Sequence, residues 1–196
     1  MNKTKRIADF LFELGTMRKL LRMHRQTLLT DDMSDNISSH SYRVAFIGWF
    51  LAYEEKADPY KTVMMCLLHD LGEIRSGDQN WVHKKYVKVF NDEIIDEQLN
   101  SLPMKDLYAL AKEYKGRVSK EAVIAKDADL IAQVLLLREY EWQGNKEAKI
   151  WLHGKGETGN AQIKKLKLAN SKRLCKAIYL GNPSDWWENL WTSQNR

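Results

Sequence analysis

The sequence predicts an all-α protein that forms a single domain over residues 1–196. Apolar residues recur every three or four positions in nearly every segment, and this spacing places them on one face of a helix. No run of alternating apolar and polar residues indicates a half-buried strand. The chain is 44% hydrophobic with only 10 Gly and 3 Pro, so it can bury a full core without a disulfide or a structural metal.

The N-terminal part of the chain predicts two helices joined by a polar loop. The first helix covers residues 4–24, and the loop covers residues 30–39. A second helix begins near Ser39 and continues the helical spacing of apolar residues. The side chains that we expect to face inward from these two helices are Ile7, Phe10, Leu11, Leu14, Leu20, Leu21, Val44, Ile47 and Leu51.

The remainder of the chain predicts further helices separated by glycines. Asp58 and Pro59 are typical of an N-cap and a first helical turn, so a third helix starts there and ends near Gly72. Residues 144–160 contain four glycines and predict a mobile loop. The other helices are predicted at residues 83–100, 103–114, 119–143 and 160–180.

Composition and local pattern exclude several classes of protein. The longest uncharged apolar run, residues 44–53, is much shorter than the ~20 residues that a membrane-spanning helix needs. Asp9 and Glu13 interrupt the apolar N-terminal segment, so no export signal is predicted. Cys66 and Cys175 lie far apart in apolar segments, which favours free buried thiols in a reducing compartment. We therefore expect a cytoplasmic protein without membrane association.

The net charge of +5 raises the question of a nucleic-acid partner. One stretch near the C-terminus has no acidic residue and carries six basic ones: Lys164, Lys165, Lys167, Lys172, Arg173 and Lys176. Ile163, Leu166, Leu174 and Ile178 recur at helical spacing within the same stretch. This pattern is better explained by the solvated face of an amphipathic helix, so we expect no nucleic-acid partner.

The dipeptide His69–Asp70 is the first sign of a chemical site. It ends an apolar helix, VMMCLLHDLGE, where a charged pair is costly to bury without a partner. A divalent cation is one such partner, because imidazole nitrogen and carboxylate oxygen are common metal ligands. Gly72 closes the helix here, so both side chains can reach one ion near the helix end. On its own, the dipeptide is better explained as a structural ion pair.

Further candidate ligands lie in two other predicted helices. His40 lies at the start of the second helix. Asp127 and Asp129 lie in a later, otherwise apolar helix, VIAKDADLIAQVLLL. The order His, then His-Asp, then Asp indicates a divalent-metal site to which three helices contribute.

This order of residues resembles the HD-domain metal-dependent phosphohydrolases, a family of all-helical bundles. The segments SSHSYRVAFIGWFLA, HDLGEIRSGD and KDADLIAQVLLLREYE carry the resemblance, within residues of about 25–142. Asp129 is preferred to Asp127 because its distance from the Glu-Tyr-Glu at residues 139–141 fits the family spacing. The cofactor that the resemblance implies is one divalent ion, which can be Mn, Co, Mg, Fe, Ni or Zn. The resemblance implies four ligands for this ion: His40, His69, Asp70 and Asp129.

Within that family the chain is most similar to the 5'-deoxyribonucleotidase-like subgroup, which removes phosphate from deoxynucleoside monophosphates. The similarity gives Glu73 and Asp78 the acid–base roles near the water and the leaving group. Glu73 returns to the helix face of His69 and Asp70, which is compatible with that role.

The same similarity assigns Arg25 to the substrate phosphate. Arg25 lies fifteen residues before His40, where the subgroup has a phosphate-binding arginine, and a guanidinium can donate two parallel hydrogen bonds to phosphate. Gln26 stands where the best-known members have a tryptophan that excludes ribose, so the sugar selectivity is open. The nearby basic residues that could replace Arg25 are Arg18, Lys19 and Arg22.

The sequence therefore predicts an HD-type helical bundle that removes phosphate from nucleoside 5'-monophosphates. Two alternatives stay open. The same metal site could hydrolyse nucleoside triphosphates or guanosine alarmones, or the chain could be a non-catalytic module that binds a nucleotide or nucleic acid. We also expect a homodimer, because the C-terminal part is rich in tryptophans that predict core or dimer contacts: Trp151, Trp186, Trp187 and Trp191.

Overall fold

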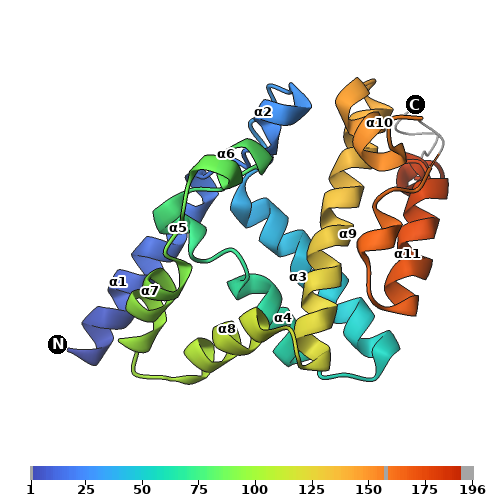
Figure 1. Ribbon diagram of the computed structural model, residues 1–196. Coiled ribbons are helices and arrows are strands. Elements are labelled where there is room, and N and C mark those ends of the chain that lie inside the picture. Colours follow the sequence, from blue (N-terminus) through green and yellow to red (C-terminus); the bar gives the residue numbers. More distant parts are fainter. Residues whose placement is uncertain (1, 157–158, 191–196) are drawn as a thin grey trace.

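Three helices form the centre of the structure. The computed structural model describes residues 2–156 and 159–190, and every regular element in these ranges is a helix, which confirms the all-α prediction. The central helices pack against one another (Figure 1) and are α3 (Ile37–Glu55), α4 (Pro59–Leu68) and α9 (Lys120–Trp142). Each first turn is capped by a side chain that accepts backbone N–H groups: Asn36, Asp58 and Ser119.

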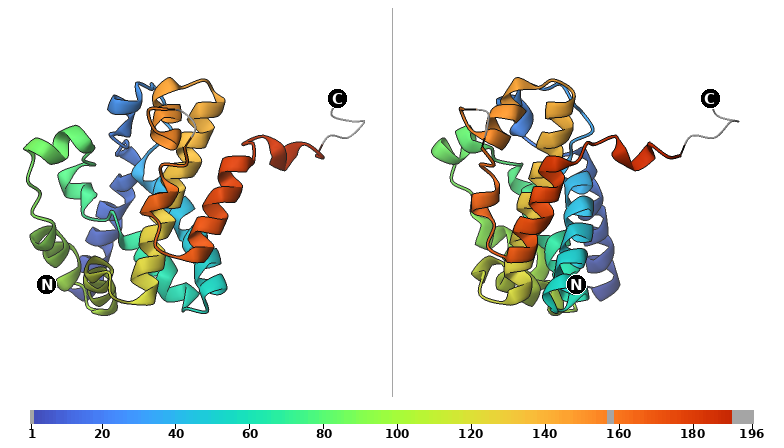
Figure 2. Two further views of the ribbon diagram at one scale, coloured as in Figure 1. Left: turned by 45° about the vertical axis from the view of Figure 1, so that its right-hand side comes forward. Right: turned by 90° about the vertical axis from the view of Figure 1, so that its right-hand side faces the viewer.

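The other helices surround this centre. In chain order they are α1 (Lys3–Gly15), η1 (Thr16–Lys19), α2 (His24–Leu28), α5 (Glu73–Ser76), α6 (Trp81–Tyr86), α7 (Asn91–Ile95), η2 (Asp96–Asn100), α8 (Asp106–Gly116), α10 (Lys146–His153), η3 (Ile163–Lys165), α11 (Ala169–Leu180) and η4 (Asp185–Trp187). Helices α1, α5 and α7 lie on one side of α9, whereas α10 and α11 lie on the other (Figures 1 and 2).

The core lies between the central helices because they present small residues to one another. Ala125, Ala128 and Ala132 are buried on α9, and α3 contributes Gly48. A Cβ atom at Gly48 would lie 2.5 Å from Cys66 Sγ, so glycine allows close contact between α3 and α4. Larger buried side chains fill the remaining space: Leu51, Met65, Ile124, Ile131, Leu137 and Leu152.

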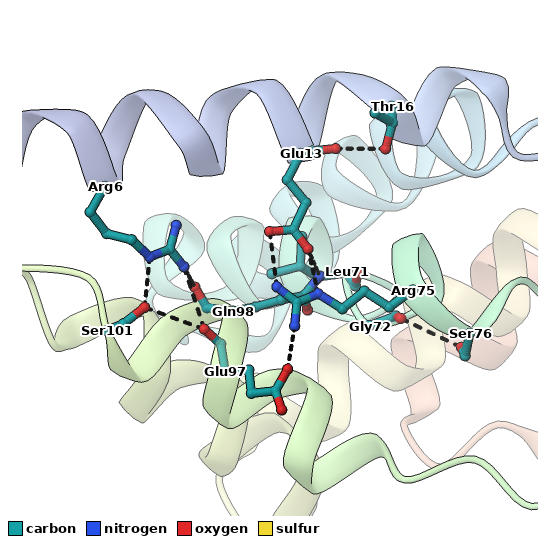
Figure 3. A network of polar contacts seen from close by, with 10 residues as sticks. All are labelled: Arg6, Glu13, Thr16, Leu71, Gly72, Arg75, Ser76, Glu97, Gln98 and Ser101. Carbon is teal, nitrogen blue, oxygen red and sulfur yellow. Dashed lines mark hydrogen bonds and ion pairs between the residues drawn. The ribbon is translucent and has the colours of Figure 1, made fainter. Parts of the chain in front are cut away.

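A polar network ties α1 to the short helix α5. Glu13 accepts hydrogen bonds from Arg75 Nε at 2.6 Å and from Gln98 Nε2 at 3.0 Å (Figure 3). Arg75 also donates to Glu97 at 2.6 Å, in the π-helical turn η2. Burial alone would raise the pKa of Glu13, but the hydrogen bonds from Arg75 and Gln98 hold it below its usual value. The network fixes the position of α5, which Glu73 begins.

The predicted helix at residues 4–24 is wrong beyond the end of α1. The chain passes through the 3₁₀ turn η1 and becomes extended at Leu20. There the carbonyl of Leu20 accepts from Ile37 N at 2.9 Å, and Arg22 N donates to the carbonyl of Asp35 at 2.9 Å. Pairing with the segment before α3 therefore replaces the helical hydrogen bonds that the apolar spacing predicted.

Two later predictions also need correction. The helix predicted at residues 83–100 is interrupted, because residues 87–90 are not helical and separate α6 from α7. The loop predicted at residues 144–160 contains the helix α10. Asn145 caps this helix through its side-chain oxygen, and its Nδ2 donates to the carbonyl of Leu28 at 2.7 Å. A capping residue thus starts a helix directly after a glycine.

The predictions about membranes and thiols can also be compared with the structure. None of the helices within the described ranges is long and apolar enough to span a membrane. Cys66 and Cys175 are both free and buried. Burial raises the pKa of both thiols, so both are protonated at neutral pH.

We predict that Gly48→Ala destabilises the protein by about 1–3 kcal/mol, because the added methyl group overlaps Cys66 Sγ in the core. Urea unfolding at neutral pH measures this loss. Gly116→Ala is the control, since a Cβ atom there meets no atom within 4 Å, and it should leave stability unchanged or raise it by up to about 1 kcal/mol. Equal stabilities of the two variants would contradict the close contact.

Candidate metal centre

Two histidines and two aspartates meet where the central helices converge. His40 lies on α3, His69 and Asp70 follow α4, and Asp129 lies on α9. His40 Nε2 is 3.2 Å from His69 Nε2 and 3.1 Å from Asp129 Oδ1. Asp70 Oδ2 lies 2.9 Å from His69 Nε2 and 3.6 Å from His40 Nε2. The structure thus brings together the four residues that the sequence resemblance assigns as metal ligands.

The donor atoms of this cluster fit a divalent cation. Ligand atoms of His40, His69 and Asp129 all lie within 4.8 Å of one another, so one ion can contact each of them at about 2.0–2.2 Å. His69 Nδ1 donates to the carbonyl of Cys66 at 2.6 Å, which leaves Nε2 directed at the cluster. Backbone hydrogen bonds of this kind commonly orient metal-binding histidines.

A proton balances part of the charge in the metal-free cluster. Burial would lower the pKa of His69, but Asp70 and Asp129 outweigh burial and raise it to about 10. Burial lowers the pKa of His40, and the nearby Arg22 guanidinium lowers it further. One imidazolium therefore faces two carboxylates. A divalent cation that displaces this proton would balance both carboxylates, so metal binding is coupled to proton release.

Arg22 contacts His40 at the ring nitrogen that does not face the cluster. Its Nη1 atom lies 2.9 Å from His40 Nδ1, and its side chain is buried. Because a guanidinium can only donate, this contact places the imidazole proton on Nε2. A His40 that ligates a metal through Nε2 carries its proton on Nδ1 instead. We therefore expect Arg22 to change its hydrogen-bond partner when the cation binds.

The two aspartates of α9 have different surroundings. Both carboxylate oxygens of Asp127 accept from Lys167 N, at 3.0 and 3.1 Å, and one also accepts from Leu168 N at 2.9 Å. Asp127 therefore anchors the segment that precedes α11. Asp129 instead lies among the histidines and accepts from Lys126 Nζ at 2.7 Å.

Of the predicted acid–base residues, Glu73 lines the cavity beside the cluster, and Asp78 is close enough to Glu73 to affect its pKa. Glu73 Oε2 is buried and has no hydrogen-bond partner among the described residues. Burial, together with the charges of Asp70 and Asp78, raises the pKa of Glu73 to about 9. Asp78 Oδ2 accepts from Met23 N at 2.5 Å. Glu73 is thus protonated in the metal-free protein at neutral pH, and a nearby cation would favour its ionised form.

Arg25 and Gln26 lie outside this cluster. Arg25 donates to Met33 Sδ at 3.2 Å and is 3.9 Å from Asp31. Together with Gln26 it lines a shallow surface cavity that contains none of the four predicted ligands. Gln26 Oε1 accepts from Asn80 Nδ2 at 2.8 Å. The structure therefore does not bring Arg25 into contact with the cluster, whereas Arg22 is in direct contact.

A cavity of about 380 Å³ opens beside the cluster. His69, Asp70, Glu73 and Asp129 all line it, and its volume suits a small ligand. Sequence reasoning missed its basic residues, because they lie in segments without a motif and no signal distinguishes them from solvated lysines and arginines. These basic lining residues are Lys84, Lys112, Lys115, Arg117 and Lys126.

Comparison with known proteins agrees with this geometry. A family model described as the HD domain matches residues 17–168, which is more than half of the chain. The chain belongs to the HD domain family. The family resemblance inferred from the motifs is therefore confirmed.

Relatives of this HD domain include enzymes of nucleotide metabolism. A 5'-deoxynucleotidase from Dictyostelium discoideum is 31% identical over 135 residues, which cover 62% of this chain and 71% of the relative. A 5'-deoxynucleotidase from Bos taurus is 28% identical over 155 residues, or 74% of this chain and 73% of the relative. The structure of a conserved hypothetical protein from Pyrococcus furiosus shares the fold, with a TM-score of 0.71, 24% identity and coverage of 89% and 99%.

We predict that Glu73→Gln stabilises the metal-free HD domain at high pH. Below the usual carboxyl pKa of 4.5 the native side chain is protonated in both the folded and the unfolded state. As the pH rises toward about 9, the Glu73 carboxyl ionises freely only in the unfolded state. The unsubstituted protein therefore loses stability over this range, and the Glu73→Gln variant does not. Each pKa unit corresponds to about 1.4 kcal/mol, and we expect a gain of about 1 kcal/mol or more near pH 8.

Urea unfolding with a chelator present, near pH 4 and near pH 8, measures this difference. Glu93→Gln on α7 is the control, because Glu93 is exposed and does not line the cavity. A gain for Glu73→Gln that is equal at both pH values would show that burial does not raise the pKa of Glu73.

Proposed function

We propose that this HD domain is a metal-dependent phosphohydrolase that removes phosphate from nucleoside 5'-monophosphates, with deoxyribonucleotides as substrates. The observation that carries the proposal is a cluster of two histidines and two aspartates that opens into a cavity lined by five basic and four acidic side chains. The basic side chains, together with a cation held by the cluster, would attract an anionic substrate, and the relatives named as 5'-deoxynucleotidases support a nucleotide.

The four predicted ligands are His40, His69, Asp70 and Asp129. A divalent cation held there would polarise the substrate phosphate and lower the pKa of a water molecule. Its identity among Mn, Co, Mg, Fe, Ni and Zn is a question of ligand geometry and metal availability. The donor set of two imidazoles and two carboxylates is compatible with each of these ions.

The protein's own acid–base groups are Glu73 and Asp78 in this proposal. Glu73 has a buried oxygen without a partner, so it can hold a proton or accept one from water as the local charge changes. Asp78 is oriented by its hydrogen bond from Met23 N. Arg25 is the proposed phosphate ligand from the family resemblance, and its nearest carboxylate, on Asp31, is 3.9 Å away, so its guanidinium is not held in a tight ion pair.

We predict that Asp70→Asn lowers the content of bound metal about tenfold or more and abolishes phosphatase activity, because it removes a charged ligand. Metal content is measured after dialysis against each cation. Activity is measured as phosphate release from matched ribo- and deoxyribonucleoside monophosphates, nucleoside triphosphates and a guanosine alarmone. The triphosphates and the alarmone test the alternative substrates for the same site.

Asp9→Asn is the control for this experiment, because Asp9 is on α1 and, among the described residues, pairs only with the exposed Lys5. It should keep full metal content and activity. Full metal occupancy and turnover in Asp70→Asn would refute the proposed site. A metal-loaded native protein that releases no phosphate from any of these nucleotides would refute the proposed function and favour a non-catalytic binding module.

We also propose a cytoplasmic homodimer. The two free, buried thiols support a reducing compartment. An exposed aromatic stripe on α3 supports association, because contiguous apolar patches commonly mark interfaces. The stripe consists of Tyr42, Phe46, Trp49, Phe50 and Tyr53. Trp151 packs against the core instead, Trp186 and Trp187 stack edge to face, and Trp191 lies outside the described residues.

We predict that Phe46→Glu converts the dimer to a monomer, because a charge would be buried in the interface formed by the aromatic stripe. Sedimentation equilibrium gives the mass, and the native protein should show twice 22.9 kDa. Phe12→Glu on α1 is the control, since Phe12 is more exposed than Phe46 and lies outside the stripe. A native protein that is monomeric at about 50 μM, well above typical dimer Kd values, would contradict the dimer.

A further inference from the structure

Arg117 has a backbone conformation that its residue type disfavours. It follows α8 as the C-cap residue, with φ of 54° and ψ of 26° in the left-handed region. Glycine is the usual residue in this conformation at helix ends, because a Cβ atom makes it less favourable. Gly116 directly precedes Arg117 but lies in the helix with a negative φ. The glycine of this segment therefore lies one residue before the left-handed position, and Arg117 occupies that position.

The left-handed conformation places the Arg117 guanidinium over a buried tyrosine. Arg117 Cζ lies 3.3 Å from the centre of the Tyr114 ring. The Tyr114 ring in turn contacts the predicted metal ligand His69 edge to face, with centroids 6.1 Å apart. A guanidinium that contacts a ring through its face can still donate from N–H groups in its own plane. The orientation of Arg117 is thus fixed by a residue that also touches the metal centre.

One donor atom of Arg117, which lines the cavity beside the metal centre, has no acceptor among the described residues. Arg117 lines this cavity together with His69, Asp70 and Asp129. Its Nη1 atom is buried and has no hydrogen-bond partner in the described part of the chain. A buried donor without an acceptor is costly, so a ligand that supplies one would bind favourably.

The other basic residues of the cavity differ from Arg117 in their partners. Lys112 and Lys115 lie within ion-pair distance of Asp92, at 3.6 and 2.5 Å. Lys126 pairs with Asp129 at 2.7 Å. Lys84 and Arg117 form no ion pair with a carboxylate in the described ranges. Of these two, Arg117 has the fixed orientation and the planar donor group that suits an oxyanion.

We propose that Arg117 binds a phosphate oxygen of the substrate in this cavity, across from the predicted metal ligands. This inference rests on the proposed function for its choice of oxyanion. A glycine at this position would relieve the strain but remove the donor. Arg117 is then a substrate-binding residue that no motif indicates, in addition to the predicted Arg25.

The test is Arg117→Gly, because glycine suits the left-handed conformation and the variant is expected to fold. Calorimetric titration of the metal-loaded protein with inorganic phosphate should show about 10- to 100-fold weaker binding, the loss expected for a hydrogen bond to a charged group. Metal content should be unchanged, and the Tm should be equal or higher. Arg117→Lys, which keeps the charge but loses the planar donor group, should bind phosphate with intermediate affinity.

Lys56→Gly is the matched control, since Lys56 is the C-cap of α3 with φ of 54° and lies outside the cavity. It should raise or keep the Tm and leave phosphate affinity unchanged. Phosphate affinity of Arg117→Gly within twofold of the native value, or a native protein that binds no phosphate, would overturn the inference. If phosphate binding depends on Arg117 but no nucleotide is hydrolysed, the inference stands while the proposed function fails.

Discussion

The burial of two carboxylates beside two imidazoles is the constraint on which the rest of the structure depends. Isolated carboxylates are costly to bury, and this cost is offset here by opposite charge and hydrogen bonds. Burial alone would raise the pKa of Asp129, but the hydrogen bond with His40 and the positive charge of His69 hold it well below its usual value. Each of the three central helices supplies part of the cluster, so the cluster can form only when α3, α4 and α9 meet at one point. The small residues at their contacts, with Gly48 as the closest, allow that approach.

The central helices could be predicted from the sequence because their signals are local. Asp58 and Pro59 start α4 as expected, and the apolar spacing of α9 fits its burial between neighbours. The sequence predictions are wrong where hydrogen bonds to distant segments determine the backbone conformation. Leu20 lies in a sequence with helical spacing, yet its carbonyl accepts from Ile37 N, so the chain is extended there. The helix α10 begins in a glycine-rich segment because Asn145 caps it and also binds the carbonyl of Leu28.

The candidate site was predictable to the extent that its residue types are rare and chemically restricted. Few side chains can ligate a cation, so the order of histidines and aspartates was enough to predict the metal centre. Basic residues are common on surfaces, and spacing along the chain does not say which of them points inward. The family spacing before His40 predicts Arg25 as the phosphate-binding arginine. In the structure, the extended segment near Leu20 instead places Arg22 against the His40 imidazole. Arg117 depends on its stacking with Tyr114, which no local pattern indicates.

The residues with unfavourable electrostatics or backbone conformation lie on short segments that rigid elements hold in place. Glu73 is half-buried beside other carboxylates and begins α5, a helix of four residues that could not be stable alone. The hydrogen bonds from Arg75 to Glu13 attach this turn to α1 and so keep the carboxyl of Glu73 near the cluster (Figure 3). Arg117 is held in the same way by its contact with the buried Tyr114. Because the central helices fix the ligands independently, a change of charge in the cavity acts on Glu73 and Arg117, each of which has an unpartnered polar atom able to respond.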